Sequence, residues 1–383
     1  MVIYAGRWSG LFNYGYFFVK PIYESGSTTI SQILCKEFGN KVANISVVLM
    51  LMGTFVAIVS QFVAGIALIT SISSIGTIAA VIIILTLTLA YVIFGGVLGA
   101  GNAGVVKTIL LYIMIIVSGI ISLKLSGGIS TLAQSLPRER YFDLFARGYI
   151  QDGGEGLSVV LGVISTQAYI LPITSAKNMK TAKTGVIISG LLITLIGLAG
   201  ILIGLLMKTM MPEIASSDVL PLFVINYIPK FIGGIILATL LISIVGSSAA
   251  MALGMTSMLC NDIYMMYISP NASDKNILQF SRMTIAIILL LTASLGMWEK
   301  ESAILKFGYL SMALRASVSF APLCIALLLP GRVKNKFAMY AVIFGSVFAV
   351  LSKLITVFGN VSLFIGVAVA FLIMVCGLIK RDK

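Results

Sequence analysis

Histidine is absent from the 383 residues, and charged side chains make up only 10% of them. Without an imidazole, the chain has no His-ligated metal site, no Ser-His-Asp triad and no imidazole proton relay. The four cysteines lie far apart and form no C-x-x-C pair, so neither a disulfide framework nor a zinc site is expected. The apolar segments contain no cluster of carboxylates, so the acid–base machinery of a membrane enzyme is not indicated.

Apolar residues dominate instead: 59% of the chain is hydrophobic and the mean hydropathy is +1.09. A soluble domain needs a polar surface that this composition does not supply, whereas a lipid bilayer is itself an apolar solvent. The net charge of +13 comes from Lys and Arg in short loops between apolar runs, a pattern typical of topology-determining charge rather than of a nucleic-acid surface. We therefore expect an all-α integral membrane protein whose partner is the bilayer and not a nucleic acid.

Eleven segments approach the roughly 20 apolar residues that a helix needs to cross the hydrocarbon core. They run over Val2–Val19, Asn44–Ser71, Gly76–Leu98, Gly104–Leu125, Glu155–Thr174, Thr184–Met207, Pro229–Leu259, Ile277–Met297, Ser302–Leu329, Phe337–Val357 and Val361–Ile379. The first segment carries Arg7, Asn13 and many aromatic residues, so an interfacial helix is the alternative interpretation there.

The orientation in the membrane is predicted from basic residues in short loops. The loops Lys177–Lys183 and Arg332–Lys336 contain several Lys and Arg residues and no acid. Such loops remain in the cytoplasm, which predicts a cytoplasmic C-terminus in the cell (plasma) membrane and places Met1 outside. Because an outside start without a signal sequence is unusual, we expect an odd number of helices to precede Met1.

The longest predicted outer segment outside the spans is Ser126–Gly154. Apolar residues such as Leu136, Tyr141 and Phe145 alternate there with charged ones. This pattern is typical of a short amphipathic helix on the outer surface, and a plain connecting loop is the alternative.

A face of small residues runs along the predicted span Pro229–Leu259. It consists of Ser243, Gly246, Ser247, Ala250 and Gly254, which share one side of a helix. Small side chains let membrane helices approach closely, so a packing seam is one interpretation. A cation site is the other, because the Ser247 hydroxyl and reachable backbone carbonyls offer the oxygens that a hard cation needs.

Four stretches, which occur in the family's own order, make the chain similar to the sodium:solute symporter family. They are Pro21 with Ser27-Thr28-Thr29-Ile30 and Phe38-Gly39; Tyr91-Val-Ile-Phe-Gly95-Gly96; Ser175-Ala-Lys-Asn178 to Gly185; and Asp218-Val-Leu-Pro-Leu with Gly234, Ala238 and Asn261-Asp262-Ile263-Tyr264. The resemblance covers nearly the whole chain. It implies a transporter of small organic solutes and does not specify the solute.

The resemblance also implies a leucine-transporter-like fold of two inverted five-helix repeats, with the binding site near the membrane midplane. Residues 1–125 then form the remainder of the first repeat, 126–154 an outer loop, 155–329 the second repeat and 330–383 two C-terminal helices. The first span corresponds to the second helix of the first repeat, so the one or two helices that open the family's fold are expected to be lacking.

The cation ligands implied by the resemblance are the Ser243 carbonyl and the positions of Gly246 and Ser247. The family usually has two hydroxyl residues at the last pair, so Gly246 removes one ligand. The family often has an acid after the Gly95-Gly96 stretch as well, where this chain has Ala103-Gly104-Val-Val-Lys107. Both departures weaken the case for Na⁺ specifically, and Na⁺ or H⁺ is the expected coupling ion. No other cofactor is implied.

The expected solute-binding residues are Thr166, Gln167 and Tyr169, because the segment Glu155–Thr174 corresponds to the broken helix that opens the second repeat. Pro172 removes a backbone donor there. Hydrogen bonds to neighbouring helices are the alternative role for these side chains. Gln61, within the second span, is a further candidate.

Arg315 lies near the middle of a predicted span, where an arginine costs at least about 2.5–3.5 kcal/mol and should face the bundle interior. No acid occupies a central span position, so carbonyls, water or an anionic solute must be its partner. We therefore expect Na⁺-coupled symport of a small organic solute that bears a carboxylate. The alternatives are a structural role for Arg315 and, for the whole chain, a non-transporting receptor or an inactive truncated remnant of a symporter.

Overall fold

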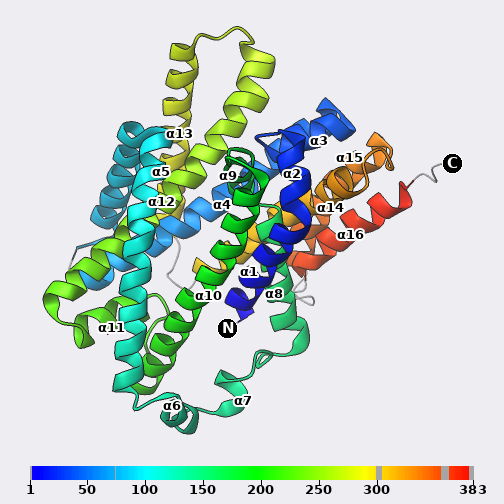
Figure 1. Ribbon diagram of the computed structural model, residues 1–383. Coiled ribbons are helices and arrows are strands. Elements are labelled where there is room, and N and C mark those ends of the chain that lie inside the picture. The colour runs from blue at the N-terminus through cyan, green and yellow to red at the C-terminus, as the bar shows by residue number, and fades with distance from the viewer. Residues whose placement is uncertain (1, 74, 299–303, 355–361, 379–383) are drawn as a thin grey trace.

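The computed structural model describes residues 2–73, 75–298, 304–354 and 362–378, and these residues fold into a bundle of helices (Figure 1). The elements are α1 (Val2–Asn13), η1 (Tyr14–Phe18), α2 (Val19–Ser25), α3 (Ile30–Phe38), α4 (Asn40–Ile72), α5 (Thr77–Leu125), α6 (Ile129–Ser135), α7 (Arg138–Tyr141), α8 (Tyr149–Ile164), η2 (Gln167–Tyr169), α9 (Ile170–Thr174), α10 (Met179–Met210), α11 (Val219–Tyr227), α12 (Lys230–Met258), η3 (Leu259–Ile268), α13 (Asp274–Trp298), α14 (Ile304–Leu328), α15 (Asn335–Leu354) and α16 (Ser362–Cys376). The predicted all-α fold is confirmed.

Seven helical segments in the described part of the chain are long and apolar enough to cross a bilayer. They are Asn40–Ile72, Thr77–Phe94, Gly104–Leu125, Met179–Met210, Lys230–Ile268, Asp274–Trp298 and Phe307–Leu328. Each overlaps a predicted span. Two shorter apolar helices, Asn335–Leu351 and Ile365–Cys376, match the last two predicted spans. The predicted bounds Ser302, Val357, Val361 and Ile379 fall outside the described residues.

The first predicted span lies inside the bundle rather than on the membrane surface. It runs through α1, the π-helical turn η1 and α2. Tyr14 is fully buried, and α1 packs against α8 and α10. Tyr14 and Phe18 are therefore packing groups, which argues against the interfacial alternative, whereas Phe12, Tyr16 and Phe17 are exposed.

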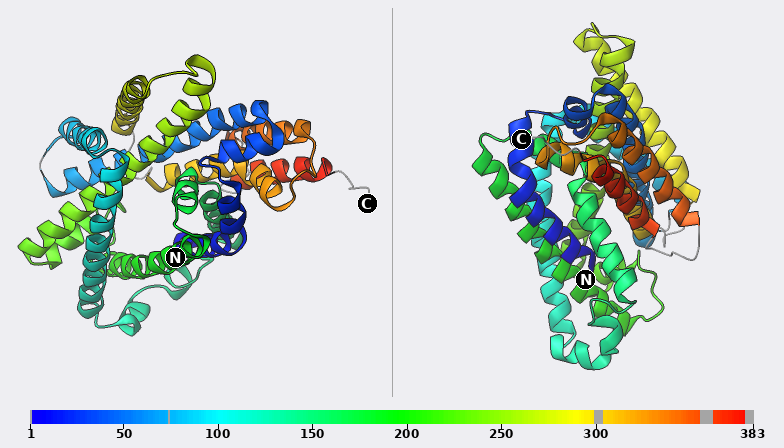
Figure 2. Two further views of the ribbon diagram at one scale, coloured as in Figure 1. Left: turned by 45° about the horizontal axis from the view of Figure 1, so that its top comes forward. Right: turned by 90° about the vertical axis from the view of Figure 1, so that its right-hand side faces the viewer.

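The centre of the bundle is α14, in which 72% of the most apolar window is buried. It packs along α4, α8 and α16 (Figure 2). Glycines permit the close approaches. A methyl group at Gly53 of α4 would lie 2.7 Å from Arg315 Cγ on α14, and one at Gly366 of α16 would collide with the Gly345 carbonyl of α15. These contacts are typical of membrane helices, which associate through small residues.

Several outer helix faces are apolar and exposed. On α5, Ile109, Ile113, Ile116 and Ile120 recur at the three- and four-residue steps of one helix face. The exposed leucines Leu191, Leu195 and Leu198 form a similar stripe on α10. A water-soluble monomer rarely exposes such stripes, whereas a bilayer covers them.

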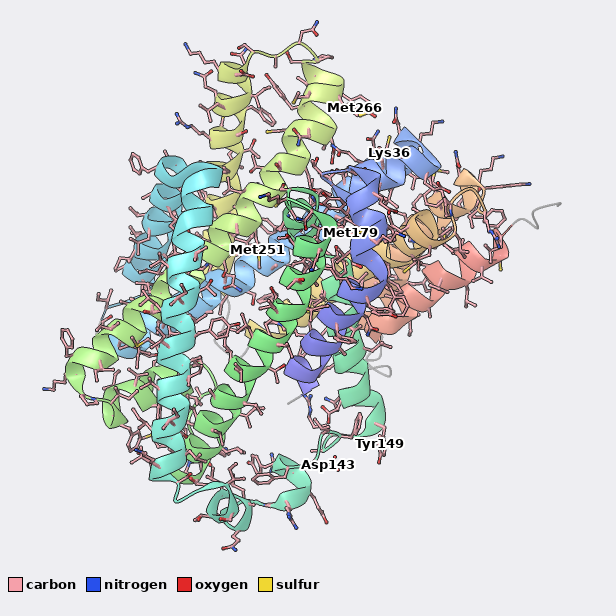
Figure 3. The ribbon with its side chains drawn as sticks, viewed as in Figure 1. Lys36, Asp143, Tyr149, Met179, Met251 and Met266 are labelled. Carbon is pink, nitrogen blue, oxygen red and sulfur yellow. The ribbon has the colours of Figure 1, made fainter. Side chains whose placement is uncertain are left out.

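The loops that were predicted to be cytoplasmic lie together at one end of the bundle. Figure 3 places Lys36 and Met266 at that end and Asp143 and Tyr149 at the opposite end, with Met179, the first residue of α10, in the half nearer Lys36. The Gly331 amide donates a hydrogen bond to Glu37, and an isolated bridge joins Val333 to Leu378. The end of α16 therefore lies on the side of α3. That this side is cytoplasmic stays a prediction.

Two local features differ from expectation. The outer segment Ser126–Gly154 forms two short helices, α6 and α7, and the first turns of α8 instead of one amphipathic helix or a plain loop. The break in the predicted span Glu155–Thr174 occurs at Ser165–Thr166 rather than at Pro172. Pro172 sits in the first turn of α9, where its missing N–H is not needed for helix hydrogen bonding.

Candidate functional site

The candidate site is built around the break between α8 and η2. The Ser165 amide still bonds to the Leu161 carbonyl, but Thr166 adopts an extended backbone with φ −94° and ψ 114°. A short 3-10 turn, η2, follows before α9 resumes the helix. The Ser165 hydroxyl is buried and has no hydrogen-bond partner among the described residues. Irregular backbone of this kind is tolerated in a membrane only where protein or a water-filled cavity surrounds it.

Arg315 approaches this break from α14. Its side chain is buried, with 7% exposure, and its stem crosses α4 at Gly53. Nη1 donates a 3.0 Å hydrogen bond to Thr166 Oγ1, and Nε donates one of 3.2 Å to the Ser311 carbonyl. Both acceptors are neutral, and the ion pairs found in the described residues involve other side chains. The guanidinium therefore faces the interior, as predicted, without a carboxylate partner in the described chain.

Two further side chains lie within electrostatic range of Arg315. One is Tyr169 of η2, and the other is Arg7 of α1. The Tyr169 ring also lies 6.2 Å from the ring of Tyr14. The structure thus brings together Thr166, Tyr169 and Arg315 of the predicted solute residues and adds Arg7, which sequence reasoning treated only as a charge that weakens the first span. Two guanidinium groups that repel each other create a positive potential that attracts an anion.

Gln167 and Gln61 have other surroundings. The Gln167 amide accepts a 2.8 Å hydrogen bond from the Ile30 amide and donates one of 2.9 Å to the Thr28 carbonyl. It therefore ties η2 to the start of α3. Half-buried Gln61 on α4 makes no hydrogen bond to another described side chain or backbone group. The contacts of neither side chain link it to Arg315, and a solute role for either stays a prediction.

The predicted cation residues lie together on α12. Ser247 Oγ donates a 2.7 Å hydrogen bond to the Ser243 carbonyl, which places two of the expected ligand oxygens side by side. The Ser243 hydroxyl is buried and lacks a hydrogen-bond partner in the described part of the protein. An orphaned buried oxygen beside this pair suits a cation, because such an atom is costly unless it is satisfied.

The small-residue face is only partly a packing seam. At Gly246 an added methyl group would lie 2.7 Å from Lys107 Nζ of α5, so a neighbouring helix covers this position closely. Ala250 is exposed, and a methyl group at Gly254 would meet no atom within 4 Å outside its own helix. One end of the face therefore packs against α5 while the other end does not need small residues for packing.

A charged cluster at the start of α8 was not anticipated. Arg147 Nη2 lies 2.5 Å from Asp152 Oδ1 and 2.6 Å from Glu155 Oε2, and both acids are buried, with 3% exposure. Burial alone would lower the pKa of Arg147, but hydrogen bonds and the charges of Glu155 and Asp152 outweigh it and raise that pKa. The sequence does carry a local signal for this cluster, because the two acids follow Arg147 by five and eight residues.

Comparisons with known proteins show which family and which fold the chain resembles. A family model described as the sodium:solute symporter family matches residues 5–345. A sodium/glucose cotransporter from Vibrio parahaemolyticus is 23% identical over 317 residues, which cover 73% of this chain and 58% of that protein. A solved structure of a Na⁺-coupled sialic acid symporter, in a substrate-bound outward-open state, is similar with a TM-score of 0.76 at 15% identity, covering 98% of this chain and 83% of that one. At this identity the structural likeness shows the fold alone.

Proposed function

Because the chain belongs to the sodium:solute symporter family, we propose that it is a secondary active transporter that couples entry of a small organic solute to entry of a cation, Na⁺. Its fold is the all-helical, leucine-transporter-like bundle, and it is a multi-pass membrane protein. The chain spans 58% of the length of the curated relative, so activity, solute and coupling ion are all part of the proposal.

The solute part of the proposal rests on one observation: Arg315 is buried at the helix break with only neutral partners. A guanidinium has five N–H donors, and two of them are used by Thr166 and Ser311. The remaining donors and the nearby charge of Arg7 favour a solute that carries a carboxylate, which can accept two parallel hydrogen bonds from one guanidinium. Thr166 and Tyr169 would border the same solute.

The cation part rests on α12. The adjacent oxygens of Ser243 and Ser247 and the unpartnered Ser243 hydroxyl would contribute to the coordination of Na⁺. Gly246 contributes no side-chain oxygen, so the described residues supply few ligands. A weak Na⁺ site is the expected consequence.

Uptake into proteoliposomes tests the proposal. The purified protein is reconstituted and offered labelled sialic acid, labelled glucose or a small monocarboxylate, under an inward Na⁺ gradient, a choline control or an inward proton gradient. We expect accumulation of at least one carboxylate under the Na⁺ gradient and little accumulation of neutral glucose. Solute binding without accumulation under any gradient would favour the receptor alternative, and accumulation only under the proton gradient would replace Na⁺ by H⁺.

A further inference from the structure

The ammonium group of Lys107 lies against the α12 face at Gly246. A methyl group at position 246 would lie 2.7 Å from Nζ, 3.4 Å from Cδ and 3.5 Å from Cε. Lys107 is half-buried near the start of the span Gly104–Leu125, and α5 packs along α12. The absence of a side chain at position 246 is therefore what permits the lysine to reach this face.

The ammonium has no ionic partner among the residues that the structure describes. The ion pairs found there involve Lys20 and Arg147 as the cations. Charged residues on the helices that pack against α5 stand mostly at the helix ends: Lys230 on α12, Lys41 on α4, Lys180, Lys183 and Lys208 on α10, and Asp274 and Lys275 on α13. Arg282 of α13 is exposed, and Asp262, beyond α12, bonds to Ser31. No charge is therefore available there to neutralise Lys107.

The same face carries the oxygens proposed to bind Na⁺. Ser243 and Ser247 lie three residues before and one residue after Gly246, and the Ser243 hydroxyl is buried without a partner. A positive group tethered by its own side chain thus reaches the position on α12 where the family's pattern has a hydroxyl ligand. Two unit positive charges cannot share such a position without strong repulsion, because the surroundings screen them less than bulk water does.

We infer that the Lys107 ammonium is a built-in competitor of the coupling cation: it rests on the α12 face in the conformation seen here, and Na⁺ must displace it to bind. The inference rests on the proposed function and specifies how its cation site is regulated. It predicts that the lysine weakens Na⁺ binding. It also predicts that the ammonium can rest on this face only because residue 246 is glycine, since a side chain there would displace it.

The test measures binding of radioactive Na⁺ to purified protein, with choline chloride keeping the ionic strength constant. Lys107→Met removes the charge and keeps an unbranched apolar stem, and we expect the half-saturating Na⁺ concentration to fall at least about tenfold. Lys107→Arg keeps the charge and should resemble the wild type. Lys124→Met, at the other end of the span Gly104–Leu125, is the matched control and should also leave Na⁺ binding unchanged, since Lys124 is exposed.

Gly246→Ala provides a second arm in which Lys107 is retained. The methyl group adds no oxygen ligand, so tighter Na⁺ binding by this variant would come from displacement of the ammonium. In a Lys107→Met background the same methyl group should bring no further tightening, and this non-additivity identifies a direct coupling between the two positions. If Lys107→Met fails to accumulate, Gly246→Ala alone still decides the question.

Unchanged or weaker Na⁺ binding in Lys107→Met or in Gly246→Ala would overturn the inference. Na⁺-driven uptake by the wild type, measured separately, distinguishes the possible failures. If the wild type shows Na⁺-driven uptake but the variants bind Na⁺ like the wild type, only the competition by Lys107 is refuted. If uptake does not respond to Na⁺ in the wild type or in any variant, the proposed Na⁺ coupling is refuted as well.

Discussion

Arg315 Nη1 donates a 3.0 Å hydrogen bond to Thr166 Oγ1, which joins the central helix α14 to the break between α8 and η2. Nothing in the described chain neutralises the guanidinium, and Arg7 lies within electrostatic range. A buried charge without a counter-ion is costly, so its retention calls for a compensating role. The proposed coordination of an anionic solute would account for both the burial and the missing carboxylate.

Replacement of Arg315 tests this role. Arg315→Gln removes the charge and the planar fork, and we expect the apparent affinity for a carboxylate solute to fall about 10- to 100-fold, the value of about one hydrogen bond to a charged group. Arg315→Lys keeps the charge without the fork and should cause a smaller loss. Uptake as a function of solute concentration measures both. If both variants fail to reach the membrane, Arg315 is structural and the preference for an acidic solute loses its main support.

Gly53 offers a way to move Arg315 without altering its charge. A methyl group at Gly53 would lie 2.7 Å from Arg315 Cγ and 3.3 Å from the Arg315 backbone nitrogen. We therefore expect Gly53→Ala to shift the guanidinium and to lower solute affinity several-fold. Gly204→Ala on α10 is the matched control, because a methyl group there meets no atom within 4 Å outside its own helix. Equal uptake affinity in the two variants would show that the position of Arg315 is not critical.

Much of this fold could be predicted, because the bilayer imposes a length and an apolar composition that are visible in the sequence. The spans on α4, α10 and α13 illustrate this, as does the interior position of Arg315. The break at Ser165–Thr166 could not be located in the same way. The sequence predicts the break at Pro172, yet Pro172 lies in the first turn of α9, where its missing N–H is not needed for helix hydrogen bonding.

Contacts between segments that are distant in the sequence could not be predicted from the sequence either. The approach of Lys107 to Gly246 depends on how α5 packs along α12, which no local pattern encodes. Gln167 has the composition of a ligand-binding residue, but its amide is already bonded to the backbone of Thr28 and Ile30. Side-chain type therefore predicts the chemistry that is available, while tertiary packing decides which groups remain free to use it.

Ser247 allows the cation site to be tested separately from the solute site. Its hydroxyl lies 2.7 Å from the Ser243 carbonyl, so Ser247→Ala removes one of a pair of adjacent oxygens. We expect the Na⁺ concentration for half-maximal uptake to rise several-fold, because a hard cation loses an oxygen ligand. Ser248→Ala is the control, since that hydroxyl bonds to the Ile244 carbonyl, one residue further around the helix. An unchanged Na⁺ dependence in Ser247→Ala would leave only the packing role for this face.

The sidedness of the membrane topology can be read from cysteine labelling. In a variant without the four native cysteines, Arg140→Cys should react with a membrane-impermeant maleimide added to intact cells. Lys180→Cys should react only after permeabilisation, because the basic loop that follows α9 is predicted to be cytoplasmic. Both positions are exposed, so burial does not confound the comparison. Labelling of Lys180→Cys from outside would invert the topology.

The cluster at the start of α8 should stabilise the outer end of the protein. Arg147 contacts two acids, Asp152 and Glu155, whose side chains are only 4% exposed, while its own side chain is 52% exposed. Arg147→Gln would leave two buried carboxylates without their cation. Breaking a fully buried pair costs about 3–5 kcal/mol, and the exposure of Arg147 reduces the expected loss to about 1–3 kcal/mol.

The thermal unfolding midpoint in detergent measures this loss, and it should fall by several degrees in Arg147→Gln. Arg138→Gln serves as the control, because Arg138 lies exposed on α7 and forms none of the ion pairs found in the described residues. Substituting Asp152→Asn and Glu155→Gln together in the Arg147→Gln background should restore most of the lost stability, since no buried charge then remains unpaired. If the triple variant is no more stable than Arg147→Gln, the destabilisation comes from lost packing around Arg147, and the ionic interpretation of the cluster fails.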